Sequence, residues 1–474
     1  MAKSVSHALR NTFFQAFGSF GVTTLNFLLM LGYARILGPG RLGELSTSQA
    51  HVLVWLAFVD LGLSNALIGA LTAAESDRGD PSRQGFRSRD IVSRVIALRF
   101  LGAVLGALGI ASLAYFRSRD GGVLNRDLFF QEIAFVPQLF ALVFQHTAIS
   151  FATYQRRQGL GQASMIIATS FSVAIPLYLA SQGASIATLL FSQSWGGFIS
   201  TIIVYLVLKW DREPVVSTRR EKTKFIISGG PWGLEAWKAL ARDAWPYASV
   251  YAAITLWQRL DQIVTSEFLG FEAAGQYALA VRLAAIPMLI ATSVGHALFP
   301  DLQRVGRDAP EKVSIYIGAL VKLVFRWGLI AIACILAAAF FFIAPLVPKF
   351  KPAFDLLPWF LPGIWAYWMH SFVVGGLFGL RRYKAVVKAH ALALIGYLMV
   401  LLPSAYYFGL AGVVVGSNSF SIFLFLGALY VAKRTQALPG NFSIAAPFSD
   451  DETALIGKIH HRFNRAPKSG VSQG

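Results

Sequence analysis

Charged residues and cysteine are both scarce in this chain of 474 residues. Asp, Glu, Lys and Arg make up 14% of the residues, against roughly 25% in a soluble domain. The single cysteine, Cys334, lies in an apolar run, which excludes an intramolecular disulfide and a cysteine-based metal site. Hydrophobic residues make up 55% of the chain and the mean hydropathy is +0.56. These values exclude a soluble, disordered, collagen-like or coiled-coil protein and leave a polytopic membrane protein.

Sequence motifs of nucleotide-binding and catalytic sites are also missing. No P-loop, GxSxG, HExxH or Rossmann pattern stands in a supporting context. The apolar segments contain histidines, among them His51, His146, His296 and His370. Each of these is alone in its segment, so none has the spacing of metal ligands along one helix. No soluble segment is long enough to form a nucleotide-binding domain. We therefore expect no catalytic residue, no cofactor and no metal, and the chain is predicted not to be an enzyme.

Twelve long apolar segments are present in place of these motifs. Each is long enough for one membrane-crossing helix, which needs about 20 residues. Such runs are too long for the strands of a small barrel. They run from about Asn11 to Leu37, Gly43 to Leu71, Ile91 to Phe116, Phe129 to Phe151, Leu160 to Ala180, Ser185 to Leu208, Ala244 to Leu269, Ala273 to Phe299, Val313 to Ile343, Leu356 to Leu380, Ala389 to Phe408 and Leu410 to Ala432. The predicted fold class is an all-α polytopic membrane protein with about 12 transmembrane helices.

The distribution of Lys and Arg predicts the orientation of these helices in the membrane. With a cytoplasmic N-terminus, 30 of the 42 basic residues fall in cytoplasmic segments, 7 in outer loops and 5 within the spans. Basic residues concentrate on the cytoplasmic side of membrane proteins, so both termini are predicted to be cytoplasmic. The net charge of +18 then indicates anionic lipid at that face, and we expect no nucleic acid partner.

The longest internal loop divides the chain into two sets of six spans. We predict an N-terminal six-helix bundle over residues 1–208 and a C-terminal six-helix bundle over residues 244–432. A cytoplasmic linker over 209–243 ends in PWGLEAWKALARD, whose apolar residues fall on one side at helical spacing, which indicates an interfacial helix. Residues 433–474 are polar and are predicted to form a disordered cytoplasmic tail.

A short pattern recurs in the two halves at an offset of 232 residues. Leu37-Gly38 falls on Leu269-Gly270 and Gly43 falls on Gly275, so that both copies read LG, four residues, G at an outer turn. Six spans per half is an even number, which predicts a parallel repeat about an axis along the membrane normal, with a central cavity between the bundles. The alternative is that turns between membrane helices converge on glycine.

Two stretches carry a resemblance to a known family. GYARILGPGRLGELSTSQAHVLVWLAFVDLGLSNALI resembles the first two spans of Wzx-type lipid-linked oligosaccharide flippases, and RLDQIVTSEFLGFEAAGQYALAVRLAAIPMLIATSVGHALFPDLQR resembles their seventh and eighth spans. These proteins form part of the polysaccharide-transport branch of the multidrug/oligosaccharidyl-lipid/polysaccharide exporter superfamily. The chain departs from the lipid II flippase type in two ways. That type usually has fourteen spans, and it has a cluster of arginines in its first two spans, where this chain has only Arg35 and Arg41.

The resemblance implies a fold, a cargo and a location. The fold would be two helical bundles around a V-shaped cavity in a bacterial or archaeal cytoplasmic membrane. The protein would move an undecaprenyl-pyrophosphate-linked glycan from the inner to the outer leaflet by alternating access. Its partners would be the lipid-linked glycan, membrane lipids and other polysaccharide-assembly proteins.

Cations within the spans are the candidate residues for such a cargo. A pyrophosphate in a low-dielectric cavity requires positive partners, and the bidentate fork of arginine suits phosphate. An arginine within the membrane is itself costly, so it faces a cavity or a partner. The candidate substrate-binding residues are Arg282, Arg259, Arg99, Lys322 and Arg326, the last two forming a basic rim at the cavity entrance.

The acidic residues of the spans allow two interpretations. Asp60 and Asp261 serve either as sites for a coupling proton or cation, or as structural charges. An Asp261–Arg282 or Arg259–Asp60 bridge that only fixes helix packing is the alternative to cargo binding. Arg99 either meets the headgroup of the cargo or extends to the membrane surface.

Two other functions compete with the flippase. A cation-coupled small-molecule exporter of the multidrug type would also have twelve spans, but its cavity should carry net acid. A membrane glycan polymerase or ligase needs a substantial outer loop, and the longest here runs only from about Arg117 to Leu128.

Overall fold

The computed structural model describes most of the chain, and the statements below refer to those residues only. They are 2–60, 62–64, 67–68, 71, 88–120, 123–155, 157–210, 234–309, 312–439, 441–455 and 457.

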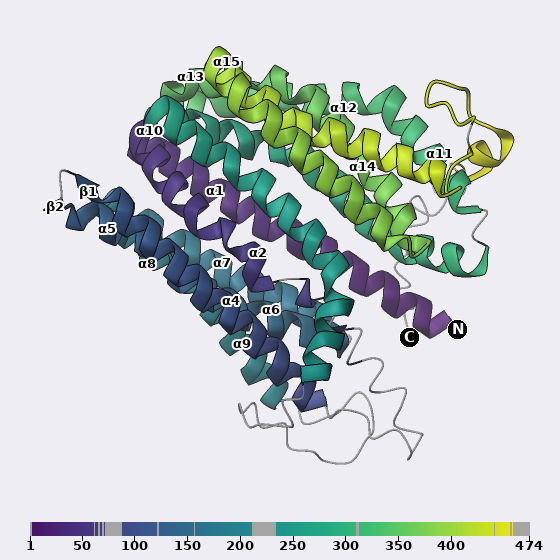
Figure 1. The fold of residues 1–474 in the computed structure, drawn as a ribbon, viewed down its shortest axis with the longest axis horizontal. Helices are drawn as coiled ribbons and strands as arrows, with labels where there is room; N and C mark the ends of the chain where they lie inside the picture. Colours follow the sequence, from purple (N-terminus) through teal and green to yellow (C-terminus); the bar gives the residue numbers. More distant parts are fainter. Residues whose placement is uncertain are drawn as a thin grey trace, which may run out of the picture. The chain divides into compact units, whose positions relative to one another are not determined.

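Helices form nearly all of the first half, with one two-stranded hairpin between α4 and α5 (Figure 1). The elements are α1 (Ala2–Val54), α2 (Leu56–Asp60), α4 (Ser88–Arg117), β1 (Arg119–Asp120), β2 (Val123–Leu124), α5 (Arg126–Ile133), α6 (Pro137–Tyr154), α7 (Gln158–Ser181), α8 (Ile186–Gln193) and α9 (Gly196–Trp210).

Helices also form most of the described residues of the second half, up to Arg434. Its elements are α10 (Leu234–Asp308), α11 (Val313–Leu323), the π-helix η3 (Val324–Gly328), α12 (Leu329–Ile343), the 3-10 turns η4 (Ala344–Leu346) and η5 (Pro348–Phe350), α13 (Lys351–Asp355), α14 (Leu357–Gly379) and α15 (Tyr383–Arg434).

Eight described helices are long and apolar enough to cross a membrane. Three of them, of 41, 48 and 52 residues, have at least twice the length of about 20 residues that one crossing needs. Each is interrupted by a glycine with positive φ, namely Gly38, Gly270 and Gly409, so each supplies two crossings. Helix α14 adds another, because its 23 residues include no charged side chain. The chain is thus an all-α multi-pass membrane protein, and its described helices are long enough to provide the twelve predicted crossings.

The three interrupting glycines confirm three predicted span ends. The predicted first, seventh and eleventh spans end one residue before Gly38, Gly270 and Gly409, whose φ angles are 74°, 84° and 59°. Glycine adopts positive φ at little cost because it has no Cβ, whereas other L-residues are strained there. The sequence therefore places these turns correctly through residue type alone.

Some predicted spans are broken or extended. Residues 134–136 separate α5 from α6, which begins at Pro137, and residues 194–195 separate α8 from α9. Helix α10 begins at Leu234, so the predicted interfacial segment continues directly into the seventh crossing. The rest of the predicted linker, residues 211–233, lies outside the described residues.

The repeated glycines meet each other in space. A Cβ on Gly43 would overlap the carbonyl of Phe271 and approach the backbone nitrogen of Gly275. A Cβ on Gly275 would overlap the carbonyl of Pro39 and approach the backbone nitrogen of Gly43. Pro39 and Phe271 are themselves related by the offset of 232. This reciprocity is the signature of a two-fold contact, and it supports the predicted internal repeat.

The chain divides into two compact units. Unit 1 comprises Met1–Leu283, Phe341–Leu356 and Leu401–Gly416, and unit 2 comprises Ala284–Phe340, Leu357–Val400 and Ser417–Gly474.

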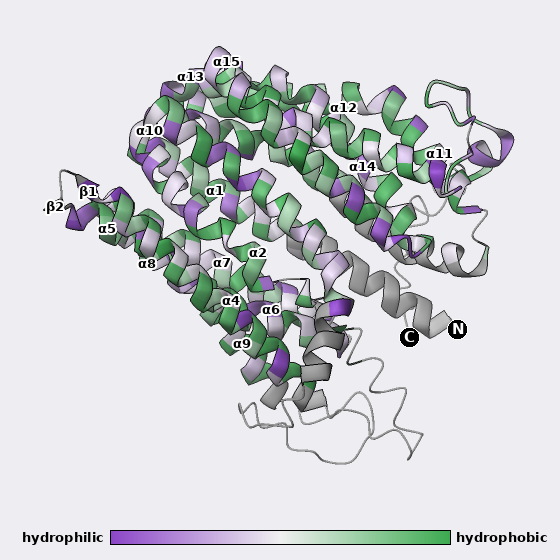
Figure 2. Cartoon of the chain, in the orientation of Figure 1, coloured by the Kyte–Doolittle hydropathy of each residue, from purple (hydrophilic) through white to green (hydrophobic). Residues whose placement is uncertain are grey.

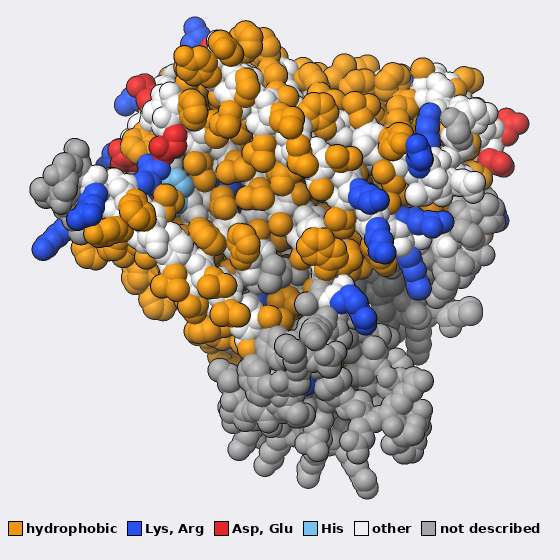
Figure 3. All heavy atoms as spheres, viewed as in Figure 1, with side chains coloured by type: hydrophobic (Ala, Val, Ile, Leu, Met, Phe, Trp, Pro, Cys, Tyr) orange, Lys and Arg blue, Asp and Glu red, His pale blue; other side chains and the backbone are white. Residues whose placement is uncertain are grey.

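Hydrophobic residues run along the helices (Figure 2), and their side chains cover much of the face shown in Figure 3. Phe342, Tyr407 and Met399 are 77%, 75% and 71% exposed. Large apolar side chains left open on this scale are expected where lipid is the surrounding solvent.

Candidate functional site

Helix α10 folds back on itself at Gly270 within unit 1. The hydroxyl of Tyr277, after the turn, donates to Oδ2 of Asp261, before the turn, at 2.8 Å. The side-chain amide of Gln262 donates to the carbonyl of Ala274 at 3.0 Å. These bonds hold the two arms of α10 side by side.

Arg259 and Arg282 stand on opposite arms of this hairpin at similar depth. They lie eleven residues before and twelve residues after Gly270, or about 17 Å from the turn at a rise of 1.5 Å per residue. That is near the middle of a hydrocarbon core of about 30 Å. Their charges are close enough to repel each other. Arg282 is exposed and Arg259 is partly exposed.

Neither arginine has a partner among the described residues. Within that part of the chain, Arg259 and Arg282 donate no hydrogen bond and form no ion pair. The alternative bridges Asp261–Arg282 and Arg259–Asp60 are therefore absent from this structure. Asp261 is held by Tyr277 instead, and Asp60 is held by a different arginine.

Two unpaired cations at mid-membrane depth require an anion. An arginine at the centre of a membrane helix costs about 2.5–3.5 kcal/mol on insertion scales, and two neighbouring like charges add repulsion. A group with several anionic oxygens would satisfy both guanidinium forks at once. The arrangement is therefore a candidate binding site for a pyrophosphate group.

Arg99 occupies the opposite environment, because it is 0% exposed and surrounded by acceptors. Its Nη2 donates to Oδ1 of Asp60 and to Oγ of Ser64, both at 2.6 Å, and its Nη1 donates to Oγ1 of Thr147 at 2.7 Å. Nδ1 of His146 lies 3.2 Å from the same Asp60 oxygen. This cluster joins α2, α4 and α6, and the placement of Arg99 and Asp60 fits structural charges.

The two groups of charges are neighbours. Tyr251, on the first arm of α10, is within electrostatic range of Asp60, Arg99 and Arg259. The end of α2 also approaches this arm closely, because a Cβ on Gly62 would lie 2.6 Å from the backbone nitrogen of Ala248. Tyr251 thus stands between the Asp60–Arg99 pair and Arg259.

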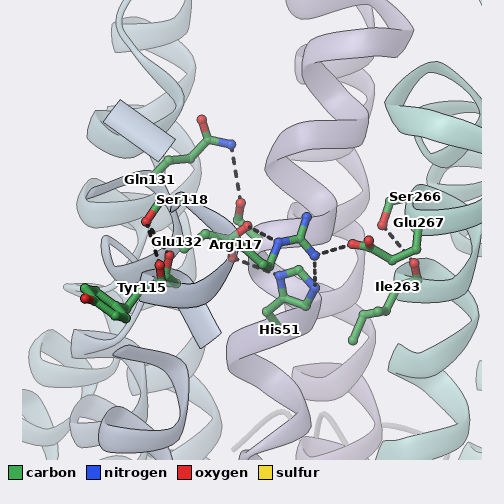
Figure 4. Close-up of polar contacts among 11 residues, drawn as sticks. His51, Tyr115, Arg117, Ser118, Gln131, Glu132, Ile263, Ser266 and Glu267 are labelled. Atoms are coloured by element: carbon green, nitrogen blue, oxygen red, sulfur yellow. Dashed lines mark hydrogen bonds and ion pairs between the residues drawn. The ribbon is translucent and has the colours of Figure 1, made fainter. Parts of the chain in front are cut away.

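A third polar cluster, shown in Figure 4, joins α1, α4 and α5 to α10. His51 donates from Nδ1 to Glu132 at 2.8 Å, and its Nε2 accepts from Arg117 at 3.3 Å. Arg117 also pairs with Glu267 on the first arm of α10. The sequence showed no partner for His51, so this cluster was not predicted. The available signal was Glu132, an acidic residue inside the predicted fourth span, and the structure buries it to 2% exposure.

Lys322 and Arg326 lie in unit 2, and the chain itself occupies them. Nζ of Lys322 donates to Oε2 of Glu452 at 2.8 Å and to the carbonyl of Pro447 at 3.1 Å. Nη2 of Arg326 donates to the carbonyl of Ala446 at 2.9 Å. The two residues predicted to form a basic rim at the cavity entrance therefore contact the chain's own C-terminal segment in this structure.

The prediction of a disordered tail is wrong for residues 441–455, which are described and packed. Composition indicated a solvated segment, but these residues supply a carboxylate and aromatic rings to the buried Lys322 and the exposed Arg326. Such contacts are not visible in composition. Residues 458–474 lie outside the described part.

No metal site emerges from this geometry. Within the described ranges, no group of three His, Cys, Asp or Glu side chains could hold a metal ion.

Comparison with known proteins gives one family match and one relative. The model of a family described as polysaccharide biosynthesis protein matches residues 8–306. The "Putative O-antigen transporter" of Shigella dysenteriae is 24% identical over 412 residues, covering 82% of this chain and 91% of that protein.

Solved structures of transporters share the fold. An inward-facing multidrug resistance MATE family transporter of the MOP superfamily matches with a TM-score of 0.67 and 15% identity, covering 89% of this chain and 96% of that one. The lipid II flippase MurJ, in an inward closed conformation, matches with a TM-score of 0.62 and 14% identity, covering 95% and 93%. The predicted fold class is therefore confirmed.

Proposed function

Because the chain belongs to the polysaccharide biosynthesis protein family, we propose that it is a flippase for a lipid-linked oligosaccharide. Its cargo is an undecaprenyl-pyrophosphate-linked glycan, which it moves from the inner to the outer leaflet by alternating access. The observation that carries this proposal is the pair of arginines at mid-membrane depth on α10, Arg259 and Arg282, which have no partner among the described residues. The O-antigen transporter relative supports the same class of cargo.

The chemistry of the cargo divides between protein and lipid. The pyrophosphate supplies the negative charge that Arg259 and Arg282 need as a partner. When it binds beside them, bidentate hydrogen bonds from the two guanidinium groups replace the water that the pyrophosphate loses. The prenyl chain needs no site in the protein, because it stays in the hydrocarbon of the bilayer. No bond of the cargo is made or broken, so an enzyme's catalytic groups are not required.

The protein resides in a bacterial or archaeal cytoplasmic membrane with both termini in the cytoplasm. Six-helix bundles over residues 1–208 and 244–432 alternate in exposing the site to each leaflet. Other polysaccharide-assembly proteins supply the lipid-linked glycan and receive it. The excess of basic residues in the predicted cytoplasmic segments supports this orientation.

A cation-coupled multidrug exporter is the second candidate, favoured by the fold shared with MATE transporters. The charges argue against it. The described acidic residues Asp60, Glu132 and Asp261 all accept hydrogen bonds from protein groups. By contrast, Arg259 and Arg282 are unpaired within the described ranges. A cavity built this way attracts anions and repels organic cations.

Depletion of the protein in its native cell tests the function. The expected result is that lipid-linked glycan is still assembled but accumulates on the cytoplasmic leaflet, because only its movement is lost. A membrane-impermeant glycosidase added to right-side-out and inside-out vesicles reports the leaflet, and re-expression of the protein is the control. Failure to assemble the lipid-linked glycan would instead favour a polymerase or ligase, and drug sensitivity without glycan accumulation would favour the exporter.

A further inference from the structure

The C-terminal segment Phe442–Glu452 buries one basic residue of the ninth span, Lys322, and contacts a second, Arg326, which stays exposed. Lys322 is only 6% exposed, and its ammonium group contacts Glu452, the Pro447 carbonyl and the ring face of Phe442 at 5.6 Å. A Cβ on Gly318, one turn before Lys322, would lie 2.5 Å from Oε1 of Glu452. The carboxylate thus fits closely against a groove that glycine keeps open.

Arg326 is held by the same segment through a local distortion of the helix. It lies in the π-helix η3, and its guanidinium group stacks 4.4 Å from the Phe448 ring while donating to the Ala446 carbonyl. The indole of Trp365 donates to the Val324 carbonyl of η3 at 3.0 Å, which satisfies a backbone group of the distorted turn. Single π-turns within α-helices occur frequently at functional sites.

The position of these residues indicates the headgroup layer of the membrane. Residues 327–346 contain no charged side chain and supply by themselves the length of about 20 residues that one crossing needs. Trp327, next to Arg326, is 63% exposed, and tryptophan concentrates at the membrane–water interface. Lys322 and Arg326 therefore lie at the level of lipid phosphates.

The carboxylate of Glu452 occupies the position beside Lys322 that another anion could take. Its Oε2 accepts from the backbone nitrogen of Ser449 at 2.8 Å and from Lys322, while Oγ of Ser449 accepts from the Glu452 nitrogen at 3.2 Å. This reciprocal capping box holds the carboxylate in place. An ammonium group and a guanidinium group one helical turn apart are also the donors that a phosphate group prefers.

We propose that Lys322 and Arg326 form a binding site for the phosphate of an anionic membrane lipid, whose charge is not neutralised within its own headgroup, and that Phe442–Glu452 is the intramolecular occupant that such a lipid displaces. The site is separate from the arginines of α10, and the inference does not rest on the flippase function. The same phosphate chemistry could come from a bilayer phospholipid or from the polyprenyl carrier.

Hydrogen–deuterium exchange of residues 441–455 in the full-length protein tests the proposal. Membranes of phosphatidylcholine alone should leave these amides protected, and an equal mixture with phosphatidylglycerol should raise their exchange several-fold. Glu452→Gln should raise exchange in both membranes. Asp451→Asn is the matched control, because Asp451 is exposed and its substitution removes the same charge; it should behave as wild type.

A charge exchange separates a specific site from the general surface potential. Lys322→Glu with Glu452→Lys should keep the segment protected in both membranes, because the ion pair is restored but the basic site is lost. Undecaprenyl phosphate in phosphatidylcholine, tested in parallel, identifies the carrier as the source if it alone releases the segment. The proposal is overturned if neither lipid changes the exchange of wild type, or if Glu452→Gln and Asp451→Asn behave alike.

Discussion

Arginine plays two different parts in the membrane segments of this protein. The Arg99 side chain is fully buried, and both terminal nitrogens have acceptors. Arg259 and Arg282 have no described partner and are partly or largely accessible. The residue type is the same, so the surroundings decide whether the charge supports the fold or remains available to a ligand.

This difference predicts opposite results for substitutions of Arg282 and Arg99. Arg282→Ala should abolish transport and leave the amount of inserted protein unchanged, because no described protein group loses a partner. Arg282→Lys should keep partial transport, since it retains the charge but not the fork. Arg99→Ala should lower the stability by about 3–5 kcal/mol, because it leaves Asp60 buried without its cation. Transport of lipid-linked glycan and the amount of protein in the membrane are the two measurements.

The control for Arg282 is Arg35→Ala, which removes an exposed arginine near the outer turn of the first span. It should affect neither transport nor protein amount. Normal transport in Arg282→Ala, or loss of the inserted protein in that variant, would rule out a role for Arg282 in holding the cargo.

At the scale of elements, glycine serves two structural purposes. Gly38, Gly270 and Gly409 have open space around them and positive φ, so they are needed for the direction of the chain. Gly43 and Gly275 have a different role, because their missing Cβ atoms allow α1 and α10 to approach backbone to backbone. The same repeat thus encodes both the turn and the contact between its two copies.

The contact predicts a pair of contrasting glycine substitutions. Gly43→Ala should lower the stability by about 1–3 kcal/mol, as overpacking in a tight core does. Gly40→Ala is the matched control, since Gly40 is helical and a Cβ added there would meet no atom within 4 Å. It should be neutral or stabilise by up to about 1 kcal/mol, because alanine favours helix. Thermal unfolding in detergent measures both, and equal unfolding temperatures would contradict the close contact.

The whole molecule is a membrane protein whose charge distribution sets its orientation. Basic residues cluster in the segments that connect alternate spans, and the positive-inside rule predicts that these segments stay on the cytoplasmic side. The C-terminal segment partly neutralises this positive charge, because it brings Glu452 and two aromatic rings to Lys322 on α11 and Arg326 on η3.

Reporter fusions test the orientation. Fusions after Asp77, Trp210 and Lys433 should report a cytoplasmic location, and a fusion after Asp120 should report the outside. Alkaline phosphatase and green fluorescent protein give opposite signals on the two sides of the membrane and serve as mutual controls. An outside location after Trp210 would contradict the division into six and six spans.

The amino-acid sequence by itself determined the membrane class, three turn positions and the internal repeat. These features depend on local composition or on glycine. Because glycine has no Cβ, it allows a turn at its own position whatever the rest of the fold is. It also singled out Arg259 and Arg282, because charges within apolar runs are rare.

Only the tertiary structure decided which charges are paired. Asp60 and Arg99 are 39 residues apart, and Lys322 and Glu452 are 130 residues apart, so no local pattern reveals either pair. For the same reason Lys322 and Arg326 look free in the sequence, and the contacts of His51 with Glu132 and Arg117 cannot be read from it. Whether an ion in a membrane protein is available to a ligand depends on which groups the folded chain brings within a few ångströms of it.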